Sequence, residues 1–263
     1  MLGLQSKVEG DNLRPSLVSA LRNRMIIGVS CGNNYTLAWD DQGNLYSWGF
    51  GRHGVLGSGS EKDILEPFLV ENINEKVIYA DAGFAHCGVV TESGNILMAG
   101  KACDGALGAG TQSAKIFTCF TPIQNPQNLR FTEISCSKGE HHGHTLALST
   151  EGQVFATGDG YKGKLGFGDL NSRNILFPID NESFQGEKIK HVSAGGIHST
   201  AVSINGIVYS WGCGSDGRLG HPEAKGHRYL FKSDTPRVIQ AILDAGVASM
   251  VRASYYHTIA LVD

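Results

Sequence analysis

Apolar residues in this chain form short runs that are separated by polar, glycine-rich segments. One run, Leu-Tyr-Ser-Trp at 45–48, has counterparts at 96–99, 154–157 and 208–211. Neighbouring positions in these runs are mostly apolar, whereas a strand with one wet face would alternate between apolar and polar residues. The pattern therefore predicts β-strands that are buried on both faces, in small sheets stacked face to face.

A longer unit surrounds this run and repeats along the chain. Residues 43–57 read G-N-L-Y-S-W-G-F-G-R-H-G-V-L-G, and similar segments occupy 94–108, 152–166 and 206–220. The closing Leu-Gly pairs end at 57, 108, 166 and 220, so the period is 108−57 = 51, 166−108 = 58 and 220−166 = 54 residues. A period this long, without a helical pattern inside it, predicts a propeller or a stacked β array.

Each unit contains four predicted strands. One strand precedes the apolar run and is joined to it by a tight turn with glycine at 43, 94, 152 or 206. The last of these glycines belongs to an Asn-Gly pair, which favours a hairpin. A proline-marked edge strand and a return strand follow the glycine loop. Four strands per unit are typical of a propeller blade, so we predict an all-β fold, a β-propeller of four-stranded blades with about four and a half repeats.

The predicted organisation follows these repeats. It comprises a polar terminus at 1–12, the second half of a preceding repeat at 13–42, and four repeats at 43–93, 94–151, 152–205 and 206–263. The loop between Leu-Gly and the edge-strand proline varies in length, and residues 138–142 are an extra segment. Insertions of this kind lie in exposed loops, where binding surfaces are usually built.

Composition excludes several classes of function. The net charge of −3 and the pI near 6.4 give no basic field for a nucleic-acid backbone. The six cysteines contain no C-x-x-C pair, and we interpret them as reduced thiols of the cytoplasm or nucleus. Charged residues interrupt the apolar stretches near the N-terminus, so we expect no secretory or membrane-spanning segment and no membrane partner.

Three glycine loops match the dinucleotide fingerprint G-x-G-x-x-G, and they begin at 49, 158 and 212. A Leu-Gly pair and a polar loop follow, where the fingerprint requires a helix. Because the loops recur at the repeat period, we interpret them as part of the blade. We expect a positive φ at the glycine of each Leu-Gly pair, since it ends every loop in the same way. These glycines are Gly57, Gly108, Gly166 and Gly220.

Histidines recur at the start of the strand that precedes the hairpin. They are His86, His144, His198 and His257. One interpretation is a hydrogen bond to backbone between blades, and the other is a ring of imidazoles that titrate or bind metal. We favour the first. The segment His141-His142-x-His144 has only Glu140 as a further ligand nearby, so no metal site is predicted, and the sequence offers no catalytic constellation and no cofactor site.

Several motifs carry a family resemblance. The unit at 43–57, V-S-A-G-G-I-H-S-T-A-V at 192–202 and S-Y-Y-H-T-I-A-L at 254–261 resemble the repeat of the regulator of chromosome condensation family. The resemblance covers about residues 13–263 and implies a β-propeller, with seven blades in the founding proteins. It also implies roles that range from nucleotide exchange on the small GTPase Ran to interaction modules in ubiquitin ligases and ciliary proteins.

Two departures from the family bear on function. The Gly-Trp-Arg-His-Thr pattern of a plant ultraviolet photoreceptor with this fold is absent, so we interpret Trp48 and Trp211 as blade core. Seven blades of ~54 residues also need roughly 380 residues, more than this chain has. An open ring leaves strand edges unpaired. We therefore expect the chain to be part of a longer protein, to dimerise, or to pair its first half-repeat with its last strand near Ile259.

The sequence thus predicts a protein-interaction scaffold, with an exchange factor for a Ran-like small GTPase as the alternative. Exchange needs no proton-transfer residue, because a factor that binds the nucleotide-free GTPase more tightly lowers the barrier to release. The expected partners are proteins, such as a small GTPase or other domains of a longer chain.

The predicted partner site combines the loop 221–235 with the insertion 138–142. Its residues are Lys225, His227, Arg228, Tyr229, Phe231, Lys232, Lys138, His141 and His142. Tyr, Phe and Arg together on an exposed loop are typical of an interface hot spot. The alternative is a longer solvated connection whose aromatic side chains pack on the blade.

Overall fold

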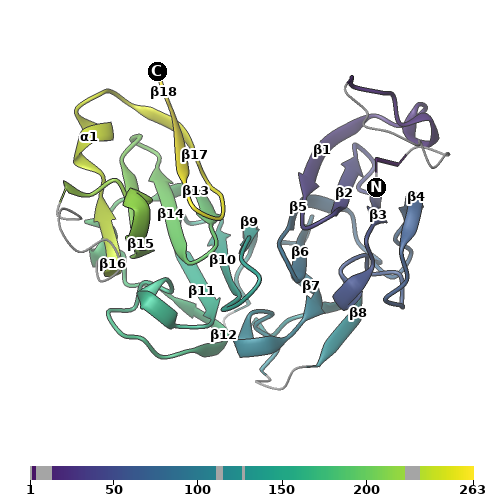
Figure 1. The fold of residues 1–263 in the computed structure, drawn as a ribbon, viewed down its shortest axis with the longest axis horizontal. Helices are drawn as coiled ribbons and strands as arrows, with labels where there is room; N and C mark the ends of the chain where they lie inside the picture. The colour runs from purple at the N-terminus through teal and green to yellow at the C-terminus, as the bar shows by residue number, and fades with distance from the viewer. Residues whose placement is uncertain (1, 4–13, 111–114, 126–127, 223–231) are drawn as a thin grey trace.

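The structure is a computed structural model that describes residues 2–3, 14–110, 115–125, 128–222 and 232–263. Its strands form four four-stranded antiparallel sheets and one two-stranded sheet (Figure 1). The strands are β1 (Ile26–Cys31), β2 (Tyr35–Asp40), β3 (Leu45–Gly49), β4 (Ile64–Leu69), β5 (Val77–Ala82), β6 (His86–Thr91), β7 (Ile96–Lys101), β8 (Ile116–Pro122), β9 (Phe131–Cys136), β10 (His144–Ser149), β11 (Val154–Gly158), β12 (Arg173–Pro178), β13 (Ile189–Ala194), β14 (His198–Ser203), β15 (Val208–Cys213), β16 (Lys232–Val238), β17 (Ala248–Ala253) and β18 (Thr258–Val262). The helical turns are η1 (Ser19–Leu21), η2 (Arg52–Gly54), η3 (Cys103–Gly105), η4 (Tyr161–Gly163), η5 (Asn181–Phe184), η6 (Ser215–Gly217) and α1 (Gln240–Leu243).

The sheets are blades around a central axis. We name them A (β1–β4), B (β5–β8), C (β9–β12), D (β13–β16) and E (β17–β18). The first strand of each blade lies innermost and contacts the first strand of the next blade. Figure 1 shows an open arc, with β1 at one end and blade E at the other. The predicted all-β propeller of about four and a half blades is confirmed, as an open ring in the described part of the chain.

Sequence repeats and blades are offset by half a unit. Residues 43–93 contain β3 and β4 of blade A, followed by β5 and β6 of blade B. Each repeat therefore crosses one blade interface. A contact between neighbouring blades then joins residues that are separated by about one repeat period.

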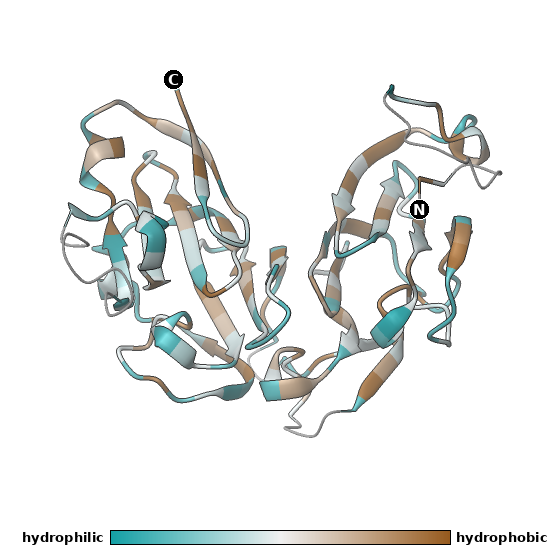
Figure 2. Ribbon diagram, viewed as in Figure 1, coloured by the Kyte–Doolittle hydropathy of each residue, from teal (hydrophilic) through white to brown (hydrophobic). Residues whose placement is uncertain are grey.

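The core lies within and between the blades. Every residue of β3 and β15 is buried, as the apolar runs predict, and Trp48 and Trp211 are in the blade core. Figure 2 shows hydrophobic residues along the strands and mostly polar ones in the connections. Cys136 is buried where β9 meets the neighbouring blade, whereas Cys31 at the same position of β1 is exposed, because no described sheet packs on that side of blade A.

The glycine that ends each Leu-Gly pair has the predicted positive φ. Its value is 65° at Gly57, 66° at Gly108, 85° at Gly166 and 70° at Gly220. Space is a second reason for glycine, since a Cβ at Gly57 would lie 2.5 Å from the Phe120 ring of blade B. The glycine loop can therefore bring neighbouring blades into contact where a larger residue would keep them apart.

Two series of hydrogen bonds join the inner strands. In the first, the turn after each inner strand donates an N–H to the next such turn: Asn33 N to Gly83 O, Phe84 N to Ser137 O, Lys138 N to Gly195 O, and Gly196 N to Ser254 O. In the second, the side chain at the fifth position of the inner strand accepts an N–H from the next inner strand: Ser30 from Ala82, Asp81 from Cys136, Ser135 from Ala194, and Ser193 from Ala253. Both series fix the register of the blades around the axis.

Candidate interaction face

One face of the propeller carries two sets of turns. The turns between first and second strands lie there, together with the glycine loops that follow the third strands, because neighbouring strands are antiparallel. We call it the loop face. The opposite face carries the hairpins between second and third strands, and we call it the hairpin face.

Most of the predicted partner loop lies outside the described residues. This applies to Lys225, His227, Arg228, Tyr229 and Phe231. Lys232 begins β16, where its Nζ lies 3.0 Å from Asp234 Oδ2 at the surface. The assignment of this loop to a partner stays a prediction.

The insertion 138–142 lies on the loop face, but its two ends occupy different environments. Lys138 turns inward, and its Nζ donates to both carboxylate oxygens of Asp81 at 3.1 and 3.2 Å. His142 turns outward, with Nδ1 3.1 Å from Asp159 Oδ2 and its ring stacked on Tyr161 at 4.6 Å between centroids. His141 is exposed. The three predicted residues therefore do not form one cluster.

Tyr161 is an exposed aromatic residue that rests on a buried cation. The Lys164 side chain is fully buried, and its Nζ lies 2.5 Å from Asp159 Oδ1 and 5.9 Å from the Tyr161 ring centre. Burial lowers the pKa of Lys164 to about 8, against the opposing effect of the Asp159 carboxylate. The Tyr161 ring therefore contacts both the buried Lys164 cation and the stacked His142 ring.

A second aromatic pair lies on the loop face of blade E. The rings of Tyr255 and Tyr256 are 4.3 Å apart, and both are exposed. The buried guanidinium of Arg218, from blade D, lies 5.2 Å from the Tyr256 ring centre and donates to the Tyr255 carbonyl at 3.4 Å. Cation–π contacts of this kind orient a ring. The tyrosine pair is thus fixed to the neighbouring blade.

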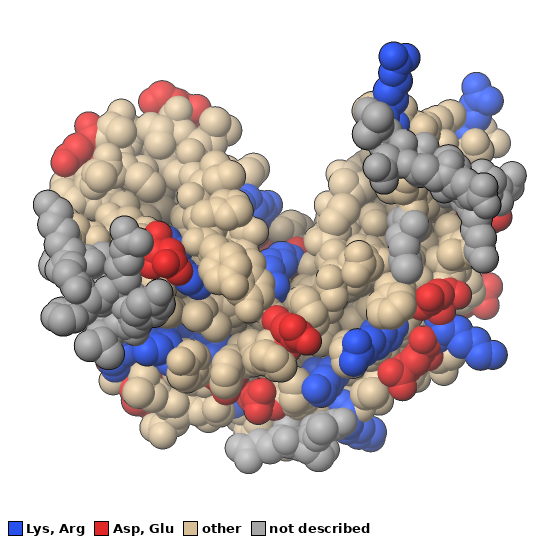
Figure 3. Space-filling view, viewed as in Figure 1, with Lys and Arg blue, Asp and Glu red and all other residues tan. Residues whose placement is uncertain are grey.

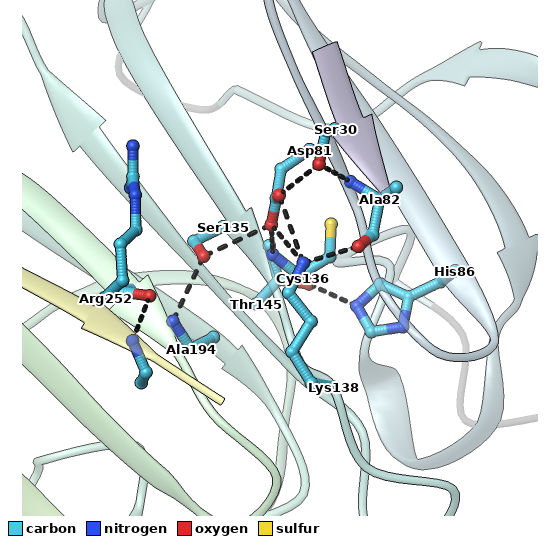
Figure 4. A network of polar contacts seen from close by, with 12 residues as sticks. Ser30, Asp81, Ala82, His86, Ser135, Cys136, Lys138, Thr145, Ala194 and Arg252 are labelled. Carbon is cyan, nitrogen blue, oxygen red and sulfur yellow. Dashed lines mark hydrogen bonds and ion pairs between the residues drawn. The ribbon is translucent and has the colours of Figure 1, made fainter. Parts of the chain in front are cut away.

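Asp81 is the centre of a polar network at the axis (Figure 4). Its carboxylate accepts from Ser30 Oγ of blade A at 2.8 Å and from Ser135 Oγ of blade C at 3.2 Å. It also accepts from the Cys136 N–H at 2.7 Å and from Lys138. One carboxylate on β5 therefore joins three consecutive inner strands.

Glu133 is a second axial carboxylate. It accepts from Tyr79 OH at 3.1 Å and lies 3.1 Å from His191 Nδ1, in the blades on either side. Arg252 Nη1 of blade E lies 3.4 Å from Glu133 Oε1, and this contact passes over blade D. Burial, followed by the Glu133 charge, raises the pKa of Tyr79 well above its ordinary value, so its hydroxyl stays a donor.

Sequence reasoning missed these axial residues. A signal existed, because the fifth position of the inner strand reads Ser, Asp, Ser, Ser and Arg along the aligned repeats. The two charged residues in an otherwise small, polar column are Asp81 and Arg252.

The recurring histidines connect neighbouring blades through hydroxyl groups. The Nε2 atoms of His86, His144 and His198 lie 2.9, 2.9 and 3.0 Å from Thr145 Oγ1, Ser199 Oγ and Thr258 Oγ1. Each hydroxyl donates to a carbonyl of the blade that holds the histidine: Ala106, Lys164 and Arg218. Each Nε2 therefore carries a proton and donates. For these three histidines a bond between neighbouring blades is present, but the expected backbone partner was wrong. The Nε2 atom donates to a hydroxyl, and that hydroxyl donates to a backbone carbonyl.

These three imidazoles are held neutral by burial. Burial, followed by the charge of Lys138, lowers the pKa of His86 to about 4. Burial and then Arg218 lower the pKa of His198 to about 3, and burial followed by Lys164 lowers that of His144 well below its ordinary value. His257 is exposed at the end of the series.

The glycine loops do not lead into helices. In blade A the loop forms η2 and then reaches Leu56-Gly57, so the dinucleotide fingerprint lacks the helix whose N-terminus would meet a pyrophosphate. No group of three or more His, Cys, Asp and Glu side chains that could hold a metal occurs in the described part of the chain. Within those same residues, no helix has the length and apolarity to span a membrane.

The repeat motif matches a known protein family. A model of the regulator of chromosome condensation (RCC1) repeat matches residues 1–39, 42–90, 151–202 and 205–261. The chain belongs to the RCC1 repeat family. Between the second and third matches, the structure contains β7 to β10, which form regular parts of blades B and C.

Curated relatives resemble the chain over most of its length. Ultraviolet-B receptor UVR8 of Arabidopsis thaliana is 30% identical over 95% of the chain and 54% of the relative. E3 ubiquitin-protein ligase HERC2 of Homo sapiens is 30% identical over 96% of the chain and 5% of the relative.

Two crystal structures share the fold. Human WBSCR16 superposes with a TM-score of 0.78 at 21% identity, over 90% of this chain and 58% of that one. Prp20p from Saccharomyces cerevisiae superposes with a TM-score of 0.75 at 23% identity, over 90% of this chain and 56% of that one. The chain thus spans about half the length of UVR8 and of both structures.

Proposed function

We propose that this chain is a protein-interaction propeller and that a protein partner binds its loop face. The observation that carries the proposal is the placement of exposed tyrosines on buried cations, Tyr161 on Lys164 and Tyr256 on Arg218. Aromatic anchors that are fixed before binding lose little conformational entropy when a partner docks. Tyr is also enriched among the residues that dominate interface energies.

Neighbouring blades contribute to this surface. Tyr161 belongs to blade C, Arg218 to blade D and Tyr256 to blade E, so the partner would span three blades. Light sensing is not part of the proposal, because Trp48 and Trp211 are buried in separate blades. All six cysteines are free, and we include a cytoplasmic or nuclear location in the proposal for that reason.

The test is quantitative capture of partners from cells with a variant that carries Tyr161→Ala and Tyr256→Ala. We expect specific partners to be recovered about tenfold less than with the parent, while the melting temperature is retained. The matched control is Phe177→Ala, which removes an exposed aromatic side chain from β12, the outer strand of blade C. If Phe177→Ala loses the same partners while the double variant still recovers them, the loop face is rejected as the binding surface.

Nucleotide exchange on a Ran-like GTPase is the second candidate. It is supported by the fold shared with Prp20p, whose structure was described together with its binding to Gsp1p and histones. The assay is release of fluorescent GDP from a Ran-like GTPase in the presence of this chain. Faster release that Arg228→Ala with Tyr229→Ala abolishes would establish exchange and would assign it to the loop 221–235. If the rate of GDP release is unchanged, exchange is rejected and the interaction scaffold stays the proposed function.

A further inference from the structure

The axial end of the loop face presents cations above carboxylates. The side chains of Asp81 and Glu133 are 15% and 5% exposed, whereas those of Lys138 and Arg252 are 25% and 47% exposed. His191, which is 35% exposed, also covers Glu133. The solvent-facing layer is therefore cationic, although the whole chain carries a net charge of −3. Figure 3 shows Lys and Arg side chains at the base of the opening in the arc.

Arg252 occupies the fifth position of its inner strand, where the other blades have a hydrogen-bond acceptor. Ser30, Asp81, Ser135 and Ser193 accept an N–H from the next inner strand at this position. A guanidinium cannot accept a hydrogen bond, so Arg252 extends toward Glu133 instead. Its contacts with Glu133, at 3.4 Å, and with the Tyr79 side chain use part of a fork of five donors. The remaining donors suit the two oxygens of a carboxylate from outside.

A cavity of about 440 Å³ opens at this end of the axis. Its walls include Asn33 and Phe84 from the first two blades, Lys138 from blade C and Tyr255 from blade E. Tyr255 also belongs to the aromatic pair on the loop face, so the cavity is continuous with the proposed partner surface. Walls of mixed polar and apolar character, with the Lys138 cation among them, fit a short segment that mixes carboxylates with apolar groups.

We propose that this axial site binds an acidic segment of a protein partner. Its carboxylates would meet Lys138 and Arg252, and its apolar groups would pack on Phe84 and Tyr255. The inference rests on the proposed function, because it specifies the chemistry of the partner that the loop face binds. Glu140 in the insertion interacts electrostatically with Tyr255 and opposes the binding of an acidic segment.

The direct test uses a fluorescein-labelled hexa-glutamate peptide and fluorescence anisotropy. We expect saturable binding at about 50 mM salt that weakens about tenfold at about 300 mM, because salt screens exposed charges. A hexa-lysine peptide of the same length is the matched probe and should not bind. Absence of saturable hexa-glutamate binding, or equal binding of hexa-lysine, overturns the proposal.

Variants separate direct contact from a structural role. Arg252→Ala and Lys138→Ala should each weaken hexa-glutamate binding about tenfold, and Arg252→Lys should weaken it less. Lys76→Ala, which removes an exposed cation from the hairpin face, should leave it unchanged. Glu133→Gln should strengthen binding about threefold, because the guanidinium loses a competing carboxylate. If Arg252 acted only by fixing blade E, Glu133→Gln would weaken binding as Arg252→Ala does, and that result overturns the proposal.

Failure of this inference is distinct from failure of the proposed function. Partner capture that depends on Tyr161 and Tyr256, without any hexa-glutamate binding, would retain the loop face and reject the acidic segment. Capture that is lost equally with Phe177→Ala would reject the loop face itself.

Discussion

Side-chain hydrogen bonds join blades A and B at the same repeat positions as at the three later interfaces, but the residue types are different. At the later interfaces a histidine donates to a hydroxyl, and the hydroxyl donates to a carbonyl. At the first interface Tyr35 stands at the histidine position and donates to the His86 carbonyl at 3.2 Å. The thiol of Cys87 replaces the hydroxyl and donates to the Val55 carbonyl at 3.1 Å.

The difference shows what this position requires. All four interfaces need a side-chain donor that reaches the next blade and a small donor that returns to a carbonyl, because buried polar groups must be paired. Imidazole is one solution among several. Only the histidine interfaces contain side chains that take up protons near neutral pH once the chain unfolds. At the first interface, burial raises the pKa of Tyr35 well above its ordinary value and keeps it neutral.

The largest expected effect is therefore loss of stability in acid. In the unfolded chain these histidines take up protons below pH ~6.5, whereas His86 and His198 in the folded chain resist protonation to pH about 4 and about 3. The unfolded state then binds more protons, and stability falls as the pH falls from about 6.5 toward 4. His86 and His198 each contribute about 2 kcal/mol of loss by pH 5, so these two contribute roughly 4 kcal/mol, and His144 adds to the loss in the same direction. Urea unfolding at pH 7 and pH 5 measures this loss.

A histidine-free variant provides the control for the acid effect. Gln at positions 86, 144 and 198 keeps a hydrogen-bond donor but does not titrate, so the free energy of unfolding should depend less on pH. If the free energy of unfolding of this variant depends on pH as steeply as that of the parent, other titratable groups cause the loss of stability in acid.

The next largest effect comes from removing one imidazole. His144→Ala leaves a cavity and removes the donor to Ser199, so we expect a loss of about 2–4 kcal/mol in the free energy of unfolding. His257→Ala changes the same repeat position where the side chain is exposed, and it should cost less than ~0.5 kcal/mol. Similar unfolding midpoints for the two variants would contradict the structural role of the buried histidine.

A smaller effect distinguishes the first two interfaces by their glycine loops. Alanine at Gly57 or Gly108 costs about 1 kcal/mol, because both have positive φ. At Gly57 the added Cβ would also lie 2.5 Å from Phe120, whereas at Gly108 it would lie 3.3 Å from Thr157. Gly57→Ala should therefore be less stable than Gly108→Ala by about 1–2 kcal/mol in thermal unfolding. The reverse order would show that Phe120 can move aside.

The smallest effect at neutral pH is expected when the first interface is given the histidine and hydroxyl side chains of the later interfaces. Tyr35→His with Cys87→Thr recreates the pair seen at His86 and Thr145, so stability at pH 7 should change by only ~1 kcal/mol. The loss between pH 7 and pH 5 should increase by about 2 kcal/mol, as for the other histidines. Cys87→Thr alone should leave the pH dependence as it is. An unaltered acid response in the double variant would show that the site does not bury the new imidazole.

Much of the fold could be predicted from the repeats. The strands, the positive φ at Gly57 and a histidine bond between blades all occur at fixed repeat positions. The bonds Ser30–Asp81 and His198–Thr258 join residues that are 51 and 60 apart, about one repeat. Aligned repeats indicate such contacts, because each repeat crosses one interface. The hydroxyl partner was missed because it lies one residue after the next histidine, where the column varies between Cys, Thr and Ser.

The sequence by itself determined the blades, and the tertiary structure determined which side chains meet at the central axis. Arg252 and Glu133 are 119 residues apart, and their contact passes over a whole blade, which no repeat period indicates. Lys138, predicted within an exposed insertion, turns to the largely buried carboxylate of Asp81. A buried charge is stable only with a partner, and the curvature of the stack determines which side chains come close enough to provide one.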